Sequence, residues 1–113
     1  MRAVWYDHIG AADDVLIHGS LDDPEVNDGE VLVRLRTSGV NPSDVKTRAG
    51  ARGGLQFPRI IPHSDGAGNI EAVGHGVDAN RIGERVWVWN GAFGRAFGTC
   101  AEYISLPANQ AVE

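Results

Sequence analysis

Cysteine is almost absent from this sequence, and long hydrophobic runs are missing. The single cysteine, Cys100, cannot form an intramolecular disulfide or supply a four-thiolate structural zinc site. No apolar stretch approaches the ~20 residues that span a bilayer, so we expect no membrane-spanning helix and no membrane partner. The N-terminal residues lack the features of a secretory signal, and we therefore expect a cytoplasmic protein.

Basic residues are also scarce. Ten Lys and Arg stand against fifteen Asp and Glu, which gives a formal net charge of −5 over 113 residues. General binding to nucleic acid needs an excess of cations, so nucleic acid is not an expected partner. One basic segment runs from Lys46 to Arg59, with no acidic residue between Asp44 and Asp65. It could face an anionic ligand, although a basic loop that balances the acidic residues 20–30 is the favoured interpretation.

Glycine, in contrast, is abundant, with 15 residues. Together with the alternation of apolar and polar residues, this predicts strands joined by tight turns, at residues 1–7, 30–40, 65–74, 86–89 and 99–106. The one candidate helix is Ser43–Ala49, for which Asn41 and Pro42 supply a start and Gly50 a stop. The pattern predicts a mainly β barrel or sandwich, whose expected core residues are Val31, Val33, Leu35, Ile70, Val73, Val86, Val88 and Ile104.

Three possible chemical motifs are weak by themselves. Residues 74–79 match the dinucleotide pattern G-x-G-x-x-A, but no helix is expected after them, so a turn between strands is favoured. The four histidines and Cys100 have no spacing typical of a metal site. Cys100 lies in an expected strand with no histidine near it in sequence, which favours a small hydrophobic role over a nucleophilic one.

Six segments in order carry a stronger signal. They are MRAV at 1–4, GEVLV at 29–33, GVNPSD at 39–44, DGAGNIEAVG at 65–74, IGERV at 82–86 and GTCAEY at 98–103. Together they resemble the N-terminal GroES-like catalytic domain of the medium-chain dehydrogenase/reductase superfamily, and within it the zinc-free, zeta-crystallin-like quinone oxidoreductase branch. The resemblance implies a partly open antiparallel β-barrel with one short helix, as one domain over residues 1–113.

The resemblance also implies where chemistry would occur. Zinc-dependent relatives have a catalytic cysteine at the position of Asn41 and a Gly-His-Glu motif where this chain has Pro62-His63-Ser64, so catalytic zinc is not expected. The expected cofactor is NADPH, and the expected substrate is a quinone or an enone. Asn41 and His63 are the expected catalytic residues, and Asn41 and Lys46 the expected cofactor contacts. His63 stands where the quinone branch usually has glycine, and Lys46 where it commonly has an aromatic hydroxyl, so both are departures from the family.

The length of the chain suggests a part of a larger enzyme. Members of the superfamily continue into a Rossmann domain that holds most of the cofactor, and no such domain is present in these 113 residues. We expect the chain alone to be inactive and its interdomain surface to favour a homodimer. The alternative is a stand-alone GroES-like binding module without catalysis. A chaperonin-cap role is a third possibility, for which residues 91–98 make a poor mobile loop.

Overall fold

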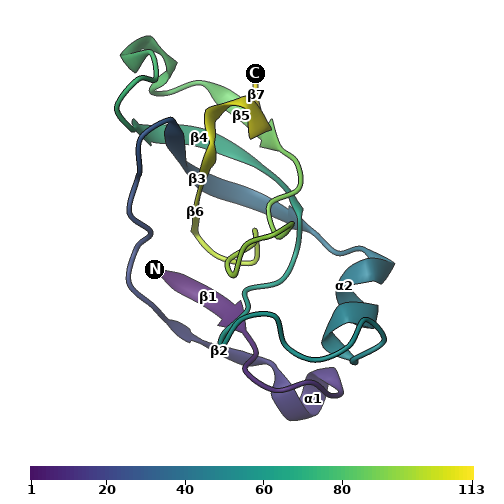
Figure 1. Cartoon of the computed structure of the whole chain (residues 1–113). Coiled ribbons are helices and arrows are strands. Elements are labelled where there is room, and N and C mark those ends of the chain that lie inside the picture. Colours follow the sequence, from purple (N-terminus) through teal and green to yellow (C-terminus); the bar gives the residue numbers. More distant parts are fainter.

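The computed structural model describes all residues, 1–113, and contains two antiparallel sheets. The small sheet pairs β1 (Arg2–Trp5) with β2 (Ile17–Ser20). The large sheet has the order β6-β3-β4-β5-β7, with bounds β3 (Glu30–Gly39), β4 (Asp65–Val73), β5 (Arg85–Val88), β6 (Tyr103–Pro107) and β7 (Ala111–Val112). Figure 1 shows the small sheet below the large one, with both α-helices at the same end of the molecule. The fold is thus mainly β, as the sequence predicts.

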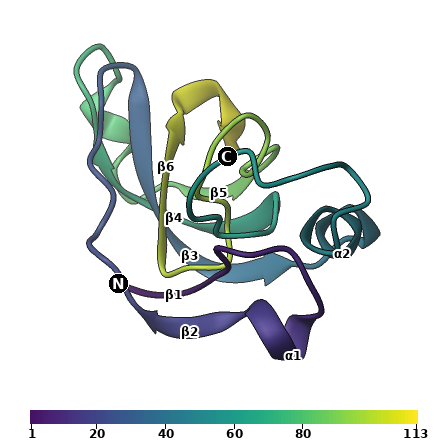
Figure 2. The same ribbon diagram turned by 60° about the horizontal axis from the view of Figure 1, so that its bottom comes forward.

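The large sheet is curled because its longest strand is irregular. The pairing of β3 with β4 shifts register between Leu32 and Val33 and again between Leu35 and Thr37. Such bulges bend a strand and increase its twist, so the sheet closes part of a barrel. Isolated bridges from Ala3 to Ala101 and from Tyr6 to Ile60 connect the start of the chain to the rest. Figure 2 shows β1 and β2 lying together below β3.

Two apolar clusters form the core. The larger one contains six of the eight expected residues as buried side chains, while Leu35 and Val73 are partly buried and pack against it. It also contains Leu106 and Ala111, which the sequence analysis did not select. The smaller cluster consists of Ala3, Trp5 and Ile61, and it joins the first strand to the segment before β4.

The helices differ in part from the expectation. The predicted helix is present as α2 (Pro42–Arg48), one residue earlier than expected. A second helix, α1 (Ala12–Val15), was not predicted, because four residues are too few for a helical apolar pattern. Two 3-10 turns, η1 (Ala79–Arg81) and η2 (Ala108–Gln110), complete the chain. No helix is long and apolar enough to cross a lipid bilayer.

Candidate functional site

The largest cleft has a volume of about 530 Å³ and lies between α2, the segment before β4 and the turn after β5. Segments far apart in sequence therefore meet at one place. Polar and charged side chains lie beside aromatic and aliphatic ones, a composition typical of small-molecule sites. The lining includes Tyr6, Ile9, Ser43, Asp44, Thr47, Arg52, Leu55, Phe57, His63, Asn90, Phe93 and Arg95.

Helix α2 presents one face to this cleft because its start is fixed. The backbone N–H of Asn41 donates to Asp44 Oδ2 at 2.7 Å, which satisfies a free donor at the helix start. Gly50 ends the helix in the left-handed region, with φ of 92°. Ser43 and Thr47, four residues apart, consequently lie on the same face and line the cleft.

Asn41 and Lys46 do not line this cleft. The Asn41 side chain donates from Nδ2 to Asp65 Oδ2 at 2.7 Å and so ties the start of α2 to the start of β4. Lys46 is exposed on α2, outside the set of cleft residues. The structure therefore does not bring either residue together with His63 in this cleft, and a cofactor contact by either stays a prediction.

His63 lines the cleft, and its backbone is unusual. Its φ is 79°, in the left-handed region that costs a residue other than glycine about 1–2 kcal/mol. The only other such residue is Asn90, with φ of 52°, and it lines the same cleft. The His63 carbonyl accepts from the Thr99 N–H at 2.8 Å, which helps to hold this conformation. Backbone strain of this kind clusters at ligand sites, so it marks the cleft as the candidate site.

The side chain of His63 is anchored on one edge only. Its Nδ1 lies 2.9 Å from Ser38 Oγ, which in turn lies 2.9 Å from Thr99 Oγ1. The Thr99 hydroxyl donates to the carbonyl oxygen of Asp65 at 2.8 Å. Nδ1 makes the only side-chain hydrogen bond of His63, so Nε2 is left for a ligand.

Two of the four cations in the basic segment have partners within the fold. Arg48 donates from Nη1 to the carbonyl oxygen of Gly10 at 2.8 Å. The Arg59 guanidinium lies over the Trp5 ring, 5.4 Å from its centroid. Arg52, in contrast, lines the cleft and forms no ion pair or hydrogen bond within the chain. Half of the cations of the segment are therefore structural, while one cation in the cleft and one on the exposed side of α2 have no partner within the chain.

Two further titratable groups lie near the cleft. Tyr6 is 2% exposed, and burial is the main cause that raises the pKa of its phenol, so the hydroxyl stays protonated near neutral pH. The sequence does not indicate Tyr6 as a cleft residue, since its position depends on the bridge to Ile60 in the segment before β4. Burial also raises the pKa of the Cys100 thiol, which packs against the smaller apolar cluster. A thiol with a raised pKa is a poor nucleophile, in agreement with the hydrophobic role.

The remaining sequence motifs do not form a site. Residues 74–79 form a turn that leads into η1, which has only three residues, and no helix follows. The turn thus lacks the helix N-terminus that a dinucleotide fingerprint needs. No group of three or more His, Cys, Asp or Glu side chains is placed to hold a metal ion.

Comparison with known proteins gives consistent matches. The sequence profile of the alcohol dehydrogenase GroES-like domain matches residues 27–113. The chain is 34% identical over 89 residues to a zebrafish (Danio rerio) synaptic vesicle membrane protein VAT-1 homolog, covering 79% of this chain and 18% of that protein. It is 33% identical over 87 residues to human quinone oxidoreductase, covering 77% of this chain and 26% of that protein.

A solved mycobacterial structure, described as a complex with NADPH, matches with a TM-score of 0.82 and 26% identity. That match covers all of this chain and 32% of the mycobacterial chain. The present chain therefore spans between about a fifth and a third of the length of the proteins it resembles.

Proposed function

Because this chain belongs to the alcohol dehydrogenase GroES-like domain family, with quinone oxidoreductases among its relatives, we propose that it is the catalytic domain of an NADPH-dependent quinone oxidoreductase-like enzyme. The proposed substrate is a quinone or another activated alkene. The observation that carries the proposal is His63, which is held in a strained backbone conformation in the largest cleft with Nε2 free.

The chain has few of the groups that a complete NADPH site needs. A dinucleotide carries several phosphate charges, whereas the cleft offers one uncommitted cation, Arg52. Arg95 also lines the cleft, but its guanidinium donates to the Ser105 carbonyl at 3.0 Å and to Gln110 Oε1 at 3.2 Å. The residues present fit the substrate and at most one end of the cofactor. We therefore propose that a second domain, of the Rossmann type, supplies the rest.

The cleft residues have distinct proposed tasks. Reduction of a quinone needs one hydride, which NADPH would supply when bound, and one proton, which is delivered to a substrate oxygen. The proposed proton-transfer residue is His63, because it lines the cleft and an imidazole can exchange a proton near neutral pH. The protonated Tyr6 hydroxyl is a second candidate donor to a developing oxyanion. Leu55 and Phe57 supply apolar surface on which a flat ring can pack.

Exposed apolar residues beside the cleft support a partner surface. Phe93 is 78% exposed in the turn that lines the cleft, and Phe97 is 37% exposed a few residues later. Isolated exposed apolar residues are common, but two aromatic side chains only four positions apart, in the segment that borders the candidate site, favour burial against another surface. We propose that the second domain covers this surface, and that a second copy of the chain occupies it when that domain is missing.

We expect the isolated 113-residue chain to be folded but to have no enzymatic activity. Most of the cofactor site is missing, so NADPH oxidation in the presence of tetramethyl-1,4-benzoquinone should not exceed the buffer rate. This quinone has no free ring position at which the Cys100 thiol could add. Absorbance of NADPH followed over time measures the rate, and a circular dichroism spectrum typical of a β protein confirms folding. Turnover by the isolated chain would contradict the need for a second domain.

A further inference from the structure

Four residues form a continuous hydrogen-bonded chain behind the cleft. It runs from His63 Nδ1 to Ser38 Oγ, on to Thr99 Oγ1, and ends at the carbonyl oxygen of Asp65. The three distances are 2.9, 2.9 and 2.8 Å, all within the range of good hydrogen bonds. Ser38 and Thr99 lie 61 positions apart in sequence, so only the folded sheet brings them together.

The Thr99 end fixes the direction of the chain. A carbonyl oxygen can only accept, so the single hydroxyl proton of Thr99 is used on Asp65. Thr99 is fully buried, at 0% exposure, and water therefore cannot serve as a partner for its oxygen. The Thr99 oxygen must then accept the proton of Ser38. Without that proton, two oxygen lone pairs would face each other at 2.9 Å.

The Ser38 hydroxyl in turn fixes the proton of the His63 ring. Because the Ser38 hydroxyl donates its only proton to Thr99, the Ser38 oxygen can only accept a hydrogen bond from His63 Nδ1. We infer that neutral His63 is held as the tautomer with the proton on Nδ1 and the lone pair on Nε2, and that Ser38 and Thr99 are the residues that position this proton. The use of this tautomer in catalysis rests on the proposed function; the tautomer itself does not.

This assignment gives His63 one definite role in the proposed reaction. Neutral His63 cannot donate from Nε2, and the protonated ring can. The proton on Nε2 moves to a substrate oxygen, the N–H bond breaks as the O–H bond forms, and the electron pair stays on Nε2. The ring returns to the neutral tautomer, since Nδ1 keeps its proton throughout. The His63 ring does not need to rotate, and Ser38 and Thr99 do not need to rearrange. The two hydroxyls thus orient His63 as a proton donor.

The tautomer can be measured on the chain itself, without substrate or cofactor. Two-bond ¹H–¹⁵N correlation spectra at mildly alkaline pH separate protonated from unprotonated ring nitrogens. We expect a protonated Nδ1 and an unprotonated Nε2 for His63. The exposed His18 and His75 have no side-chain hydrogen bond within the chain, and they serve as internal references for the tautomer mixture of a solvated ring.

Three variants test whether the two hydroxyls cause this preference. Thr99→Val keeps the shape but removes the hydroxyl, which frees the Ser38 proton for Nδ1, so the Nε2-protonated tautomer should become the major one. Thr99→Ser keeps the hydroxyl and should restore the wild-type pattern. Ser38→Ala, at an exposed position, should shift His63 to the pattern of His18 and His75 even if Thr99→Val fails to fold.

A wild-type spectrum with the proton on Nε2, or a His63 signal unchanged by Ser38→Ala, would overturn the inference. Failure of the native protein, at its full length, to oxidise NADPH with a quinone while His63 keeps its Nδ1 proton would contradict the proposed function alone.

Discussion

Replacing Gly98 with alanine is expected to destabilise the fold by about 3 kcal/mol or more. A Cβ atom at this position would lie 2.1 Å from the carbonyl oxygen of His63 and within 3 Å of those of Pro62 and Ile61. All three obstacles are backbone atoms, so no side chain can turn aside to make room. Urea unfolding should show the loss as a lower midpoint, and thermal unfolding as a decrease of roughly 10 °C or more.

The backbone around Gly98 also holds the candidate site in place, because it is hydrogen-bonded to the segment that contains His63. The Gly98 N–H donates to the Ile61 carbonyl at 2.8 Å, and the Thr99 N–H donates to the His63 carbonyl at 2.8 Å. Any shift of this segment therefore moves His63 and Thr99 together. Gly54→Ala is the matched control, because a Cβ there meets nothing within 4 Å and its φ is not in the left-handed region. Equal stability of the two alanine variants would show that the close approach at Gly98 does not occur.

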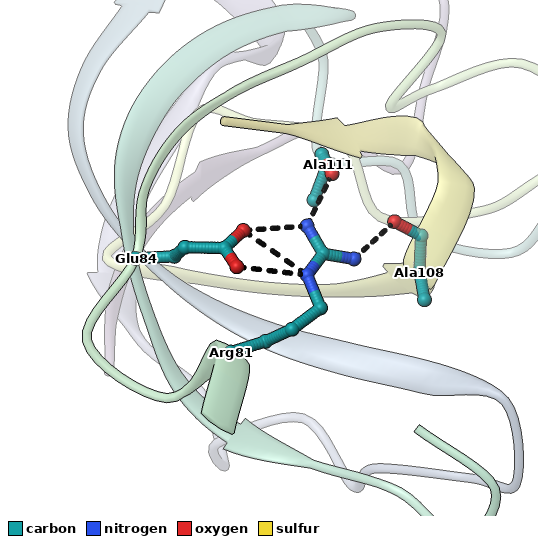
Figure 3. Close-up of polar contacts among 4 residues, drawn as sticks. All are labelled: Arg81, Glu84, Ala108 and Ala111. Carbon is teal, nitrogen blue, oxygen red and sulfur yellow. Dashed lines mark hydrogen bonds and ion pairs between the residues drawn. The ribbon is translucent and has the colours of Figure 1, made fainter. Parts of the chain in front are cut away.

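Replacing Arg81 with methionine is expected to cost about 2–4 kcal/mol and to release the C-terminal strand. Its guanidinium donates to the carbonyl oxygens of Ala108 at 2.9 Å and Ala111 at 2.7 Å. It also pairs with Glu84, through Nε at 3.0 Å and Nη2 at 2.9 Å (Figure 3). The side chains of both members of the pair are only about a fifth exposed, 22% and 20%. Methionine keeps the length of the stem but leaves two carbonyls and a carboxylate without this partner.

Amide hydrogen exchange locates the effect of Arg81→Met. Strand β7 pairs with β5 through Val112 and Ala111, and its amides should exchange much faster in the variant, while those of β3 and β4 remain protected. Arg85→Met is the control, since Arg85 is exposed on β5 and has no partner within the chain, and its stability should change by less than about 0.5 kcal/mol. Unchanged exchange in β7 after loss of Arg81 would mean that the strand is held by its sheet pairing alone.

The sequence predicts the long strands well, because their burial pattern is local. Val31 and Val33 alternate with partly buried or exposed neighbours in β3, and Val86 and Val88 do the same in β5. These four positions are buried as expected. The start of α2 is also predictable, because its signals lie within four residues: Pro42 and the hydrogen bond from the Asn41 N–H to Asp44.

The candidate site was harder to predict, because it depends on contacts between distant segments. His63 was selected by family resemblance, and the structure places it in the cleft. Nothing near Tyr6 in sequence indicates that this residue, just after β1, would line the same cleft as His63. Which face of α2 meets the cleft was also not evident, and the structure selects Thr47 rather than Lys46. Ile61 is fully buried only because its segment packs on Trp5 and bridges to Phe97.

The structure explains in part why a histidine can stand at position 63, where the family usually has glycine. The family resemblance gives glycine at this position in most quinone oxidoreductases, and the φ of 79° is one that glycine adopts at little cost. Histidine is strained there, yet the ring gains a bond to Ser38 at 2.9 Å. A residue kept in a strained conformation with one ring nitrogen free is consistent with a chemical role for Nε2.

The most direct test of the proposed function is the rate of NADPH oxidation by the native protein, at the length at which its source cell makes it, with tetramethyl-1,4-benzoquinone as acceptor. The account predicts quinone-dependent oxidation by a species of roughly 30 kDa or more, the size of two domains. A native species of 12.1 kDa that folds but oxidises no NADPH with this or any other activated alkene would contradict it, and would favour a stand-alone binding module.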